Sequence, residues 1–207
     1  MSPDGVNKPI GEALDEIRTL VDSRNALLDL LDADAILARV DQAASADAVV
    51  EFVNSLPRLL ELLVTDDLGA VRPWEITRRF PGQGWLEWSP LLRAAVATVF
   101  DQWWLTVLSA HPSRPPVGDV LATLVALELP LSRWLHPLLH SLDGPGARHL
   151  LDIVMGELEG DGWEEHDDER QQILAWCRTE PVVMGVTLVG AVHLDEGRFG
   201  DLLDALL

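Results

Sequence analysis

Residues 89–108 read SPLLRAAVATVFDQWWLTVL, and this stretch decides the fold class. Ser89 followed by Pro90 is a typical helix start, with the serine as N-cap and the proline at the first helical position. After it, pairs of adjacent apolar residues recur at every fourth position, which gives a helix with an unusually wide apolar stripe. The pairs are Leu91/Leu92, Ala95/Val96, Val99/Phe100, Trp103/Trp104 and Val107/Leu108. Such a helix is typical of the centre of a bundle, where neighbours contact it on two sides.

Helical spacing of apolar residues continues on both sides of this stretch, whereas the alternation expected of half-buried strands is scarce. We therefore predict an all-α fold of about nine or ten helices, packed as a multi-helix bundle or as stacked helical hairpins like an α-solenoid. Before the central helix, helices are expected over residues 9–31, 32–40 and 46–64, with a short one near 74–79. After it, helices are expected over residues 117–128, 130–142, 146–157, 163–178, 181–193 and 197–207.

Two of these predictions have a local alternative. Pro57 lies inside the helix expected over 46–64 and is expected to kink or divide it, because proline lacks the amide hydrogen and clashes with the preceding turn. Residues 182–192 are rich in β-branched side chains, so a strand is the alternative to a helix there. That strand is the main alternative to the all-α prediction.

The length of 207 residues is sufficient for one well-buried core. We therefore predict a single all-α domain over residues 1–207. A sub-division is the alternative, with N-terminal helices over 1–68, an Arg/Trp-rich joint over 69–89 and a C-terminal helical bundle over 90–207. The joint is expected because glycines and prolines interrupt the helical pattern there. They are Gly69, Pro73, Pro81, Gly82 and Gly84.

The charge balance is strongly acidic, with 34 Asp and Glu residues against 15 Lys and Arg and a net charge of −19. This charge repels phosphate backbones and anionic lipids, so it argues against nucleic-acid and membrane binding and favours a protein partner with a basic surface. The single cysteine, Cys177, excludes an internal disulfide framework and a zinc site made of cysteines. The chain start has no signal-peptide pattern, and the longest apolar stretch, residues 181–194, is too short to span a bilayer. We expect a cytoplasmic protein.

Two histidines four residues apart form a candidate metal site. His136 and His140 share one face of the expected helix, a separation at which two imidazoles can bind one ion. His149 and Asp152 follow and would complete the ligand set, with zinc as the expected ion. No glutamate follows the first histidine, so the His-Glu-x-x-His pattern of metalloproteases is absent. The alternative is that these are ordinary structural histidines.

The acidic stretch over residues 157–168 resembles a calcium-binding EF-hand loop in its spacing, with glycine at the sixth position. Its candidate oxygen ligands are Glu157, Glu159, Asp161, Glu165 and Asp168. It departs from the pattern at the last position, where Asp168 replaces a long bidentate glutamate. The alternative is a capped helix start, with Asp161 as N-cap and Glu164 closing a capping box.

The most unusual local chemistry lies in RPWEITRRFPGQGWLEW, residues 72–88, where the charge turns positive inside an acidic chain. Arginine and tryptophan often dominate binding interfaces, because each combines a large contact area with directed hydrogen bonding. The candidate partner-binding residues are Arg72, Trp74, Arg78, Arg79, Trp85 and Trp88. The alternative is that the tryptophans fill the space between helices while the arginines pair with nearby acids.

The sequence shows no organised catalytic set, so the leading hypothesis is a non-enzymatic helical interaction or regulatory protein without a cofactor. It would bind a protein partner through the Arg/Trp-rich segment and its acidic surfaces. A metal-dependent helical enzyme using His136, His140 and His149 is the alternative. A third hypothesis, an acidic mimic of nucleic acid, follows from the charge alone. The sequence leaves the oligomeric state open.

Overall fold

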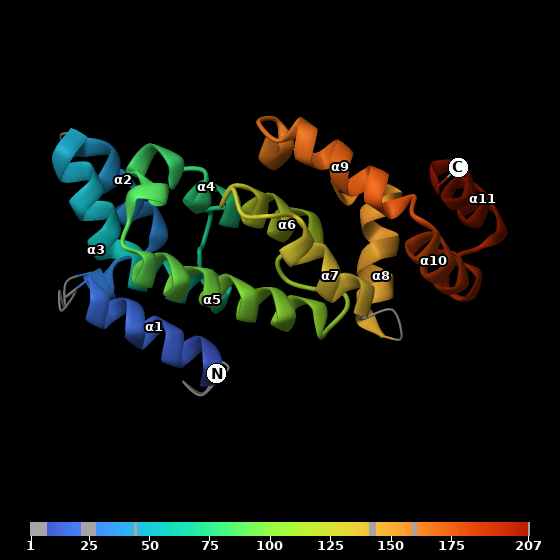
Figure 1. Cartoon of the computed structure of the whole chain (residues 1–207), viewed down its shortest axis with the longest axis horizontal. Coiled ribbons are helices and arrows are strands. Elements are labelled where there is room, and N and C mark those ends of the chain that lie inside the picture. The colour runs from blue at the N-terminus through green and yellow to red at the C-terminus, as the bar shows by residue number, and fades with distance from the viewer. Residues whose placement is uncertain (1–7, 22–27, 44, 141–143, 159–160, 207) are drawn as a thin grey trace. The chain divides into compact units, whose positions relative to one another are not determined.

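A computed structural model describes residues 8–21, 28–43, 45–140, 144–158 and 161–206 of the chain (Figure 1). All regular secondary structure in these ranges is helical, which confirms the all-α prediction. Within them, eleven α-helices are joined by loops, 3₁₀ turns and one π-helical turn. The chain forms two compact units, Met1–Trp103 and Trp104–Leu207, and the boundary lies inside helix α5 (Pro90–Leu108).

The first unit has α3 as its most connected helix, because both α1 and α2 pack against it. The elements are α1 (Lys8–Leu20), a 3₁₀ turn (Leu28–Leu30), α2 (Ala33–Gln42), α3 (Ser45–Val64), α4 (Pro73–Thr77), two 3₁₀ turns (Pro81–Gln83 and Trp85–Glu87) and the first part of α5. The Arg/Trp-rich segment 69–89, expected as a joint, lies inside this unit. The single domain over residues 1–207 and its alternative, the sub-division, both stay predictions.

Helix α5 begins as predicted from the sequence. Pro90 is its first residue, and the Ser89 hydroxyl oxygen accepts a hydrogen bond of 3.2 Å from the Leu92 amide, as an N-cap does. Every member of the predicted apolar pairs except Leu91 is buried. The wide apolar stripe read from the sequence is therefore a covered surface.

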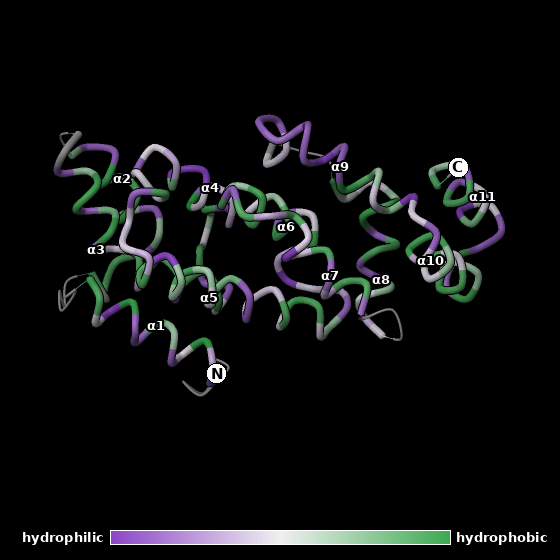
Figure 2. Tube along the Cα trace, in the orientation of Figure 1, coloured by the Kyte–Doolittle hydropathy of each residue, from purple (hydrophilic) through white to green (hydrophobic). Residues whose placement is uncertain are grey.

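The second unit is organised around α8, which packs against α7 and α10, while α10 also packs against α11. The elements after α5 are α6 (Val117–Val125), α7 (Ser132–His140), α8 (Pro145–Asp152), the π-helical turn (Ile153–Glu157), a 3₁₀ turn (Asp161–Trp163), α9 (Asp167–Cys177), α10 (Glu180–His193) and α11 (Glu196–Leu206). Figure 2 shows the hydrophilic first turns of α9 in purple and the apolar residues of α10 in green. Gly190 allows α10 to approach α11 closely, because a Cβ atom at this position would overlap the Leu202 side chain.

The first helix is shorter than predicted, since α1 ends at Leu20 instead of Leu31. Residues 28–30 form a separate 3₁₀ turn, and the part of the predicted helix over 22–27 lies outside the described residues. The sequence after Val21 contains aspartate, serine and asparagine, whose side chains compete for backbone hydrogen bonds and disfavour a helix interior. Apolar spacing alone overlooks this signal.

Three other local expectations are decided by the structure. Helix α3 runs through Pro57 from Ser45 to Val64, so the proline does not divide it. Residues 182–192 lie in α10, so the helix prediction is confirmed there and the strand alternative is wrong. Helix α9 begins at Asp167, after the separate 3₁₀ turn that holds Asp161, so Asp161 is not its N-cap.

A helix needs about 20 predominantly apolar residues to cross a bilayer. None of the described helices meets this requirement by itself. Helices α9 and α10 meet it only when taken together, and they are bent by 75° at their junction. Helix α10, the more apolar of the two, has 14 residues.

Candidate functional site

Trp85 and Trp88, the last two tryptophans of the Arg/Trp-rich segment, lie in the core of the first unit. Trp85 and Trp88 are buried, and their rings meet edge to face with centroids 5.3 Å apart. Phe80 contacts Trp85 at 5.4 Å and Phe52 at 5.5 Å between centroids. The indole N–H of Trp88 donates a 2.9 Å hydrogen bond to the Gln83 carbonyl. These two tryptophans therefore fill space between helices.

The arginines of the same segment lie nearer the surface. Arg79 donates two hydrogen bonds to the Asp41 carboxylate, at 2.7 and 3.2 Å. The guanidinium of Arg78 lies 5.0 Å from the ring centroid of half-buried Trp74, which is cation–π geometry. Arg72 is exposed at the start of α4. Of the candidate partner surface, Arg72 and Arg78 are thus exposed, and Trp74 and Arg79 are half-buried.

The histidine pair of α7 lies on an exposed face of that helix. His136 and His140 stack with ring centroids 6.2 Å apart, and Nδ1 of His136 lies 3.2 Å from the Ser132 carbonyl oxygen. Within the described ranges, the group of possible metal ligands that the fold brings together contains His149 and Asp152 but neither histidine of α7. The predicted set of four is therefore divided between two places.

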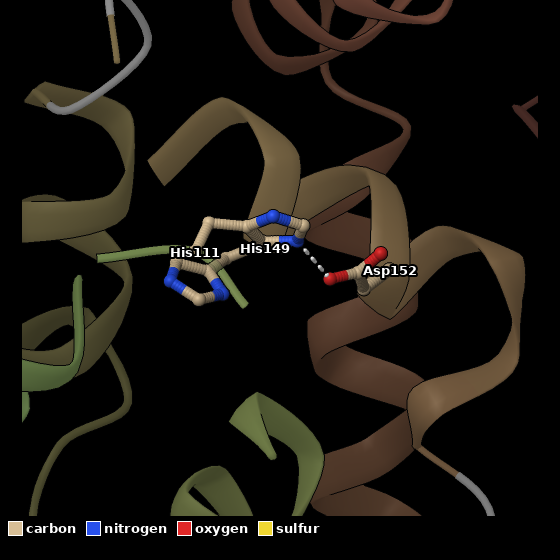
Figure 3. Close-up of side chains that lie close together, drawn as sticks. All are labelled: His111, His149 and Asp152. Atoms are coloured by element: carbon tan, nitrogen blue, oxygen red, sulfur yellow. Dashed lines mark hydrogen bonds and ion pairs between the residues drawn. The ribbon is translucent and has the colours of Figure 1, made fainter. Parts of the chain in front are cut away.

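The third member of the group around His149 and Asp152 is His111, which follows the end of α5 (Figure 3). One possible ligand atom from each residue lies within 4.8 Å of the others. His111 Nε2 lies 2.6 Å from a carboxylate oxygen of Asp152, and the two imidazole centroids are 5.0 Å apart. His149 and Asp152 are three residues apart in α8 and so share one helix face. The loop after α5 and helix α8 converge here.

The environment of His149 disfavours its charged form and favours one tautomer of the neutral ring. Burial lowers the pKa of the His149 imidazole, because removal from water disfavours the charged form. Its Nε2 lies 2.8 Å from the Ala110 carbonyl oxygen and 3.2 Å from that of Val107. Carbonyl oxygens only accept hydrogen bonds, so Nε2 of the neutral ring carries the proton and Nδ1 carries the free lone pair. His149 thus both caps the end of α5 and keeps one nitrogen able to bind a cation.

His111 is the member of this group that the sequence did not indicate. It lies 41 positions before Asp152, so no local spacing connects the two. The one local signal is its place three residues after the end of a strongly apolar helix.

The calcium-like stretch is only partly described. Glu159 and the side chains of Glu157 and Asp161 lie outside the described residues. Glu165 and Asp168 are exposed, and Asp168 lies with two other acids in the first turn of α9, where carboxylates stabilise a helix. Calcium binding by this stretch stays a prediction.

Helix α10 exposes a row of large apolar side chains on the face opposite its packed one. Met184, Leu188 and Val192 are 58%, 66% and 77% exposed. Their spacing of four residues places them on one side of the helix. Two exposed acids lie near the ends of α10: Glu180 is its first residue, and Asp195 lies two residues after its last residue, His193. This exposed row, Met184/Leu188/Val192, is called the apolar row of α10 below.

Comparisons of the chain with protein-family models, with curated proteins and with solved structures find no match. Function is therefore inferred from the surfaces and side-chain groups described above. Two features stand out by their chemistry: the apolar row of α10 and the group His111, His149 and Asp152.

Proposed function

We propose that this protein is a non-enzymatic interaction protein that binds a basic, amphipathic helix of a partner protein along α10. The single observation that supports the proposal is the apolar row Met184, Leu188 and Val192. Contiguous apolar side chains on a water-exposed surface are typical of docking sites. Residues four apart on a helix match the spacing of anchor residues on an amphipathic partner helix.

The charge around the row supports a basic partner. The whole chain carries a net charge of −19, and acids lie near both ends of α10, Glu180 at its start and Asp195 two residues after its end. Basic residues near the ends of a partner helix would complement these acids and accelerate association. A second copy of this chain would bring the same acidic charge to the interface, and an anionic membrane would be repelled. A basic protein segment is therefore the occupant that fits.

The experiment measures binding of a synthetic peptide to the full chain. The peptide has 14 residues, the length of α10, and consists of leucine and lysine in amphipathic helical order. A scrambled peptide of equal composition separates shape from charge. Four proteins are compared by calorimetry: the unaltered chain, Leu188→Glu, Leu91→Glu as a matched control, and Arg78→Glu as a test of the first unit. Leu91 is 65% exposed, nearly the same as Leu188, but lies in the first unit.

The proposal predicts that the ordered peptide binds more tightly than the scrambled one. Leu188→Glu should weaken binding about 10- to 100-fold, the effect of losing one buried leucine contact, and Leu91→Glu should not change it. Equal affinity for both peptides, or no loss in Leu188→Glu, contradicts the proposal. It is also contradicted if Leu188→Glu abolishes self-association in light scattering or binding to neutral lipid vesicles. Loss of binding in Arg78→Glu alone would place the interface on the first unit instead.

A further inference from the structure

We infer that His111, His149 and Asp152 form a zinc-binding site that joins the loop after α5 to helix α8. The inference is independent of the partner surface on α10. Three side chains from two elements converge, with possible ligand atoms within 4.8 Å of one another. No short sequence motif contains all three residues, since 41 positions separate His111 from Asp152.

The spacing of the group is close to that of a zinc centre. Ligand atoms about 2.0–2.2 Å from a tetrahedral ion lie roughly 3.4 Å from one another. The observed separations range from the 2.6 Å contact between His111 and Asp152 up to 4.8 Å. A bound ion would widen that contact by about 0.8 Å and draw the longest separation inwards by at most about 1.4 Å.

The orientation of His149 matches that of a metal-bound histidine. A ligating imidazole typically donates its other N–H group to a carbonyl or carboxylate, which fixes the ring and directs the lone pair at the ion. The Nε2–H of His149 has two carbonyl acceptors, on Ala110 and Val107, so Nδ1 is the nitrogen that would bind. The hydrogen bonds that hold the ring are thus present in the fold itself.

The donor set selects the ion. Two imidazole nitrogens and one carboxylate suit zinc, whereas calcium and magnesium prefer oxygen ligands alone. Three protein ligands leave the fourth position to water. The side chains of His111 and Asp152 are 20% and 32% exposed, so an ion can reach the group from solvent. Binding would stabilise the second unit, because the unfolded chain holds these residues far apart.

The test measures Zn²⁺ affinity of the untagged, chelator-treated full chain by competition with a chromophoric chelator, and Co²⁺ absorption as a spectroscopic check. The test variants are His111→Gln and Asp152→Asn, chosen because both leave the buried His149 and its hydrogen bonds in place. The matched control is the double variant His136→Gln/His140→Gln, which removes the exposed histidine pair of α7. Thermal unfolding with and without Zn²⁺ is recorded for all four proteins.

The inference predicts one Zn²⁺ per chain, a raised unfolding midpoint, and the absorption bands of four-coordinate Co²⁺. His111→Gln should weaken Zn²⁺ binding by about 100-fold or more and Asp152→Asn by at least about 10-fold, since even residues behind the ligands have effects of that size. The control should bind as the unaltered chain does. Equal affinity in the test variants, no binding at micromolar Zn²⁺, or loss of binding only in the control overturns the inference.

Discussion

Helices α5 and α10 are both rich in apolar residues, but they differ in how many of their faces are covered. In α5 the adjacent apolar pairs form one wide buried stripe. In α10 a buried row, Val182, Val186 and Gly190, is offset by two positions from the exposed row, Met184, Leu188 and Val192. Two positions on an α-helix correspond to about 200°, so the rows lie on opposite faces. An apolar helix is therefore not always fully covered by its own chain.

The largest effect expected from this contrast is on stability. Phe100 in α5 is fully buried, and Phe100→Ala should lower the free energy of unfolding by about 3–5 kcal/mol through lost burial and the cavity left behind. Leu188→Ala in α10 should change it by less than about 0.5 kcal/mol, since its side chain is exposed. Urea unfolding followed by circular dichroism measures both. Similar losses for the two variants would mean that the row of α10 is covered by this chain.

A second effect concerns Cys177, which is buried at the end of α9, just before α10. Burial raises the pKa of the Cys177 thiol to about 12, from an ordinary value of 9.0, because the thiolate is removed from water. The folded chain at pH 8 should therefore react with a thiol reagent about 1000-fold more slowly than the urea-unfolded chain. Because the unfolded chain releases this proton more readily, stability should fall as the pH rises above 9.0. Comparable reaction rates in the two states would show an open core at Cys177.

The smallest effect tests how tightly the covered row of α10 is packed. Gly190→Ala would place a Cβ atom against Leu202 and Phe199 of α11, and should destabilise the fold by about 1–2 kcal/mol despite the better helix propensity of alanine. Gly11 in α1 has no atom within 4 Å of a Cβ built there, so Gly11→Ala is the matched control. It should stabilise by up to about 1 kcal/mol. Thermal unfolding of both variants measures the change in stability. A stabilising effect of Gly190→Ala would contradict the close approach of α10 to α11.

Much of the fold follows from local sequence signals. Ser89 and Pro90 predicted the start of α5, and apolar spacing predicted its buried stripe, because both depend on residues a few positions apart. Residues 182–192 form a helix despite their β-branched side chains, since packing outweighs intrinsic propensity. The end of α1 at Leu20 differs from the prediction, because the apolar spacing continues beyond it and does not register the polar residues after Val21, which disfavour a helix interior.

The candidate sites were less predictable. The sequence predicts His149 and Asp152 as possible ligands. It pairs them with His136 and His140, which share a helix face, whereas the structure brings them together with His111. Residues brought together by folding leave no trace in local spacing. The exposed row of α10 could not be separated from its buried row by sequence either, since both recur every four residues. Only the neighbours in space show which row is covered.

The hydrogen bonds between His149 and the end of α5 also set an order of events during synthesis. The terminal carbonyls of a helix have no partner within the helix itself. Just after α5, the Ala110 carbonyl oxygen lies 2.8 Å from Nε2 of His149, a side chain made 39 residues later, while the Val107 carbonyl also accepts the Ala110 amide within its own turn. As the chain leaves the ribosome, the Ala110 carbonyl is therefore expected to remain hydrated until α8 has emerged. The last turn of this helix is expected to be among the later parts of the chain to become fixed.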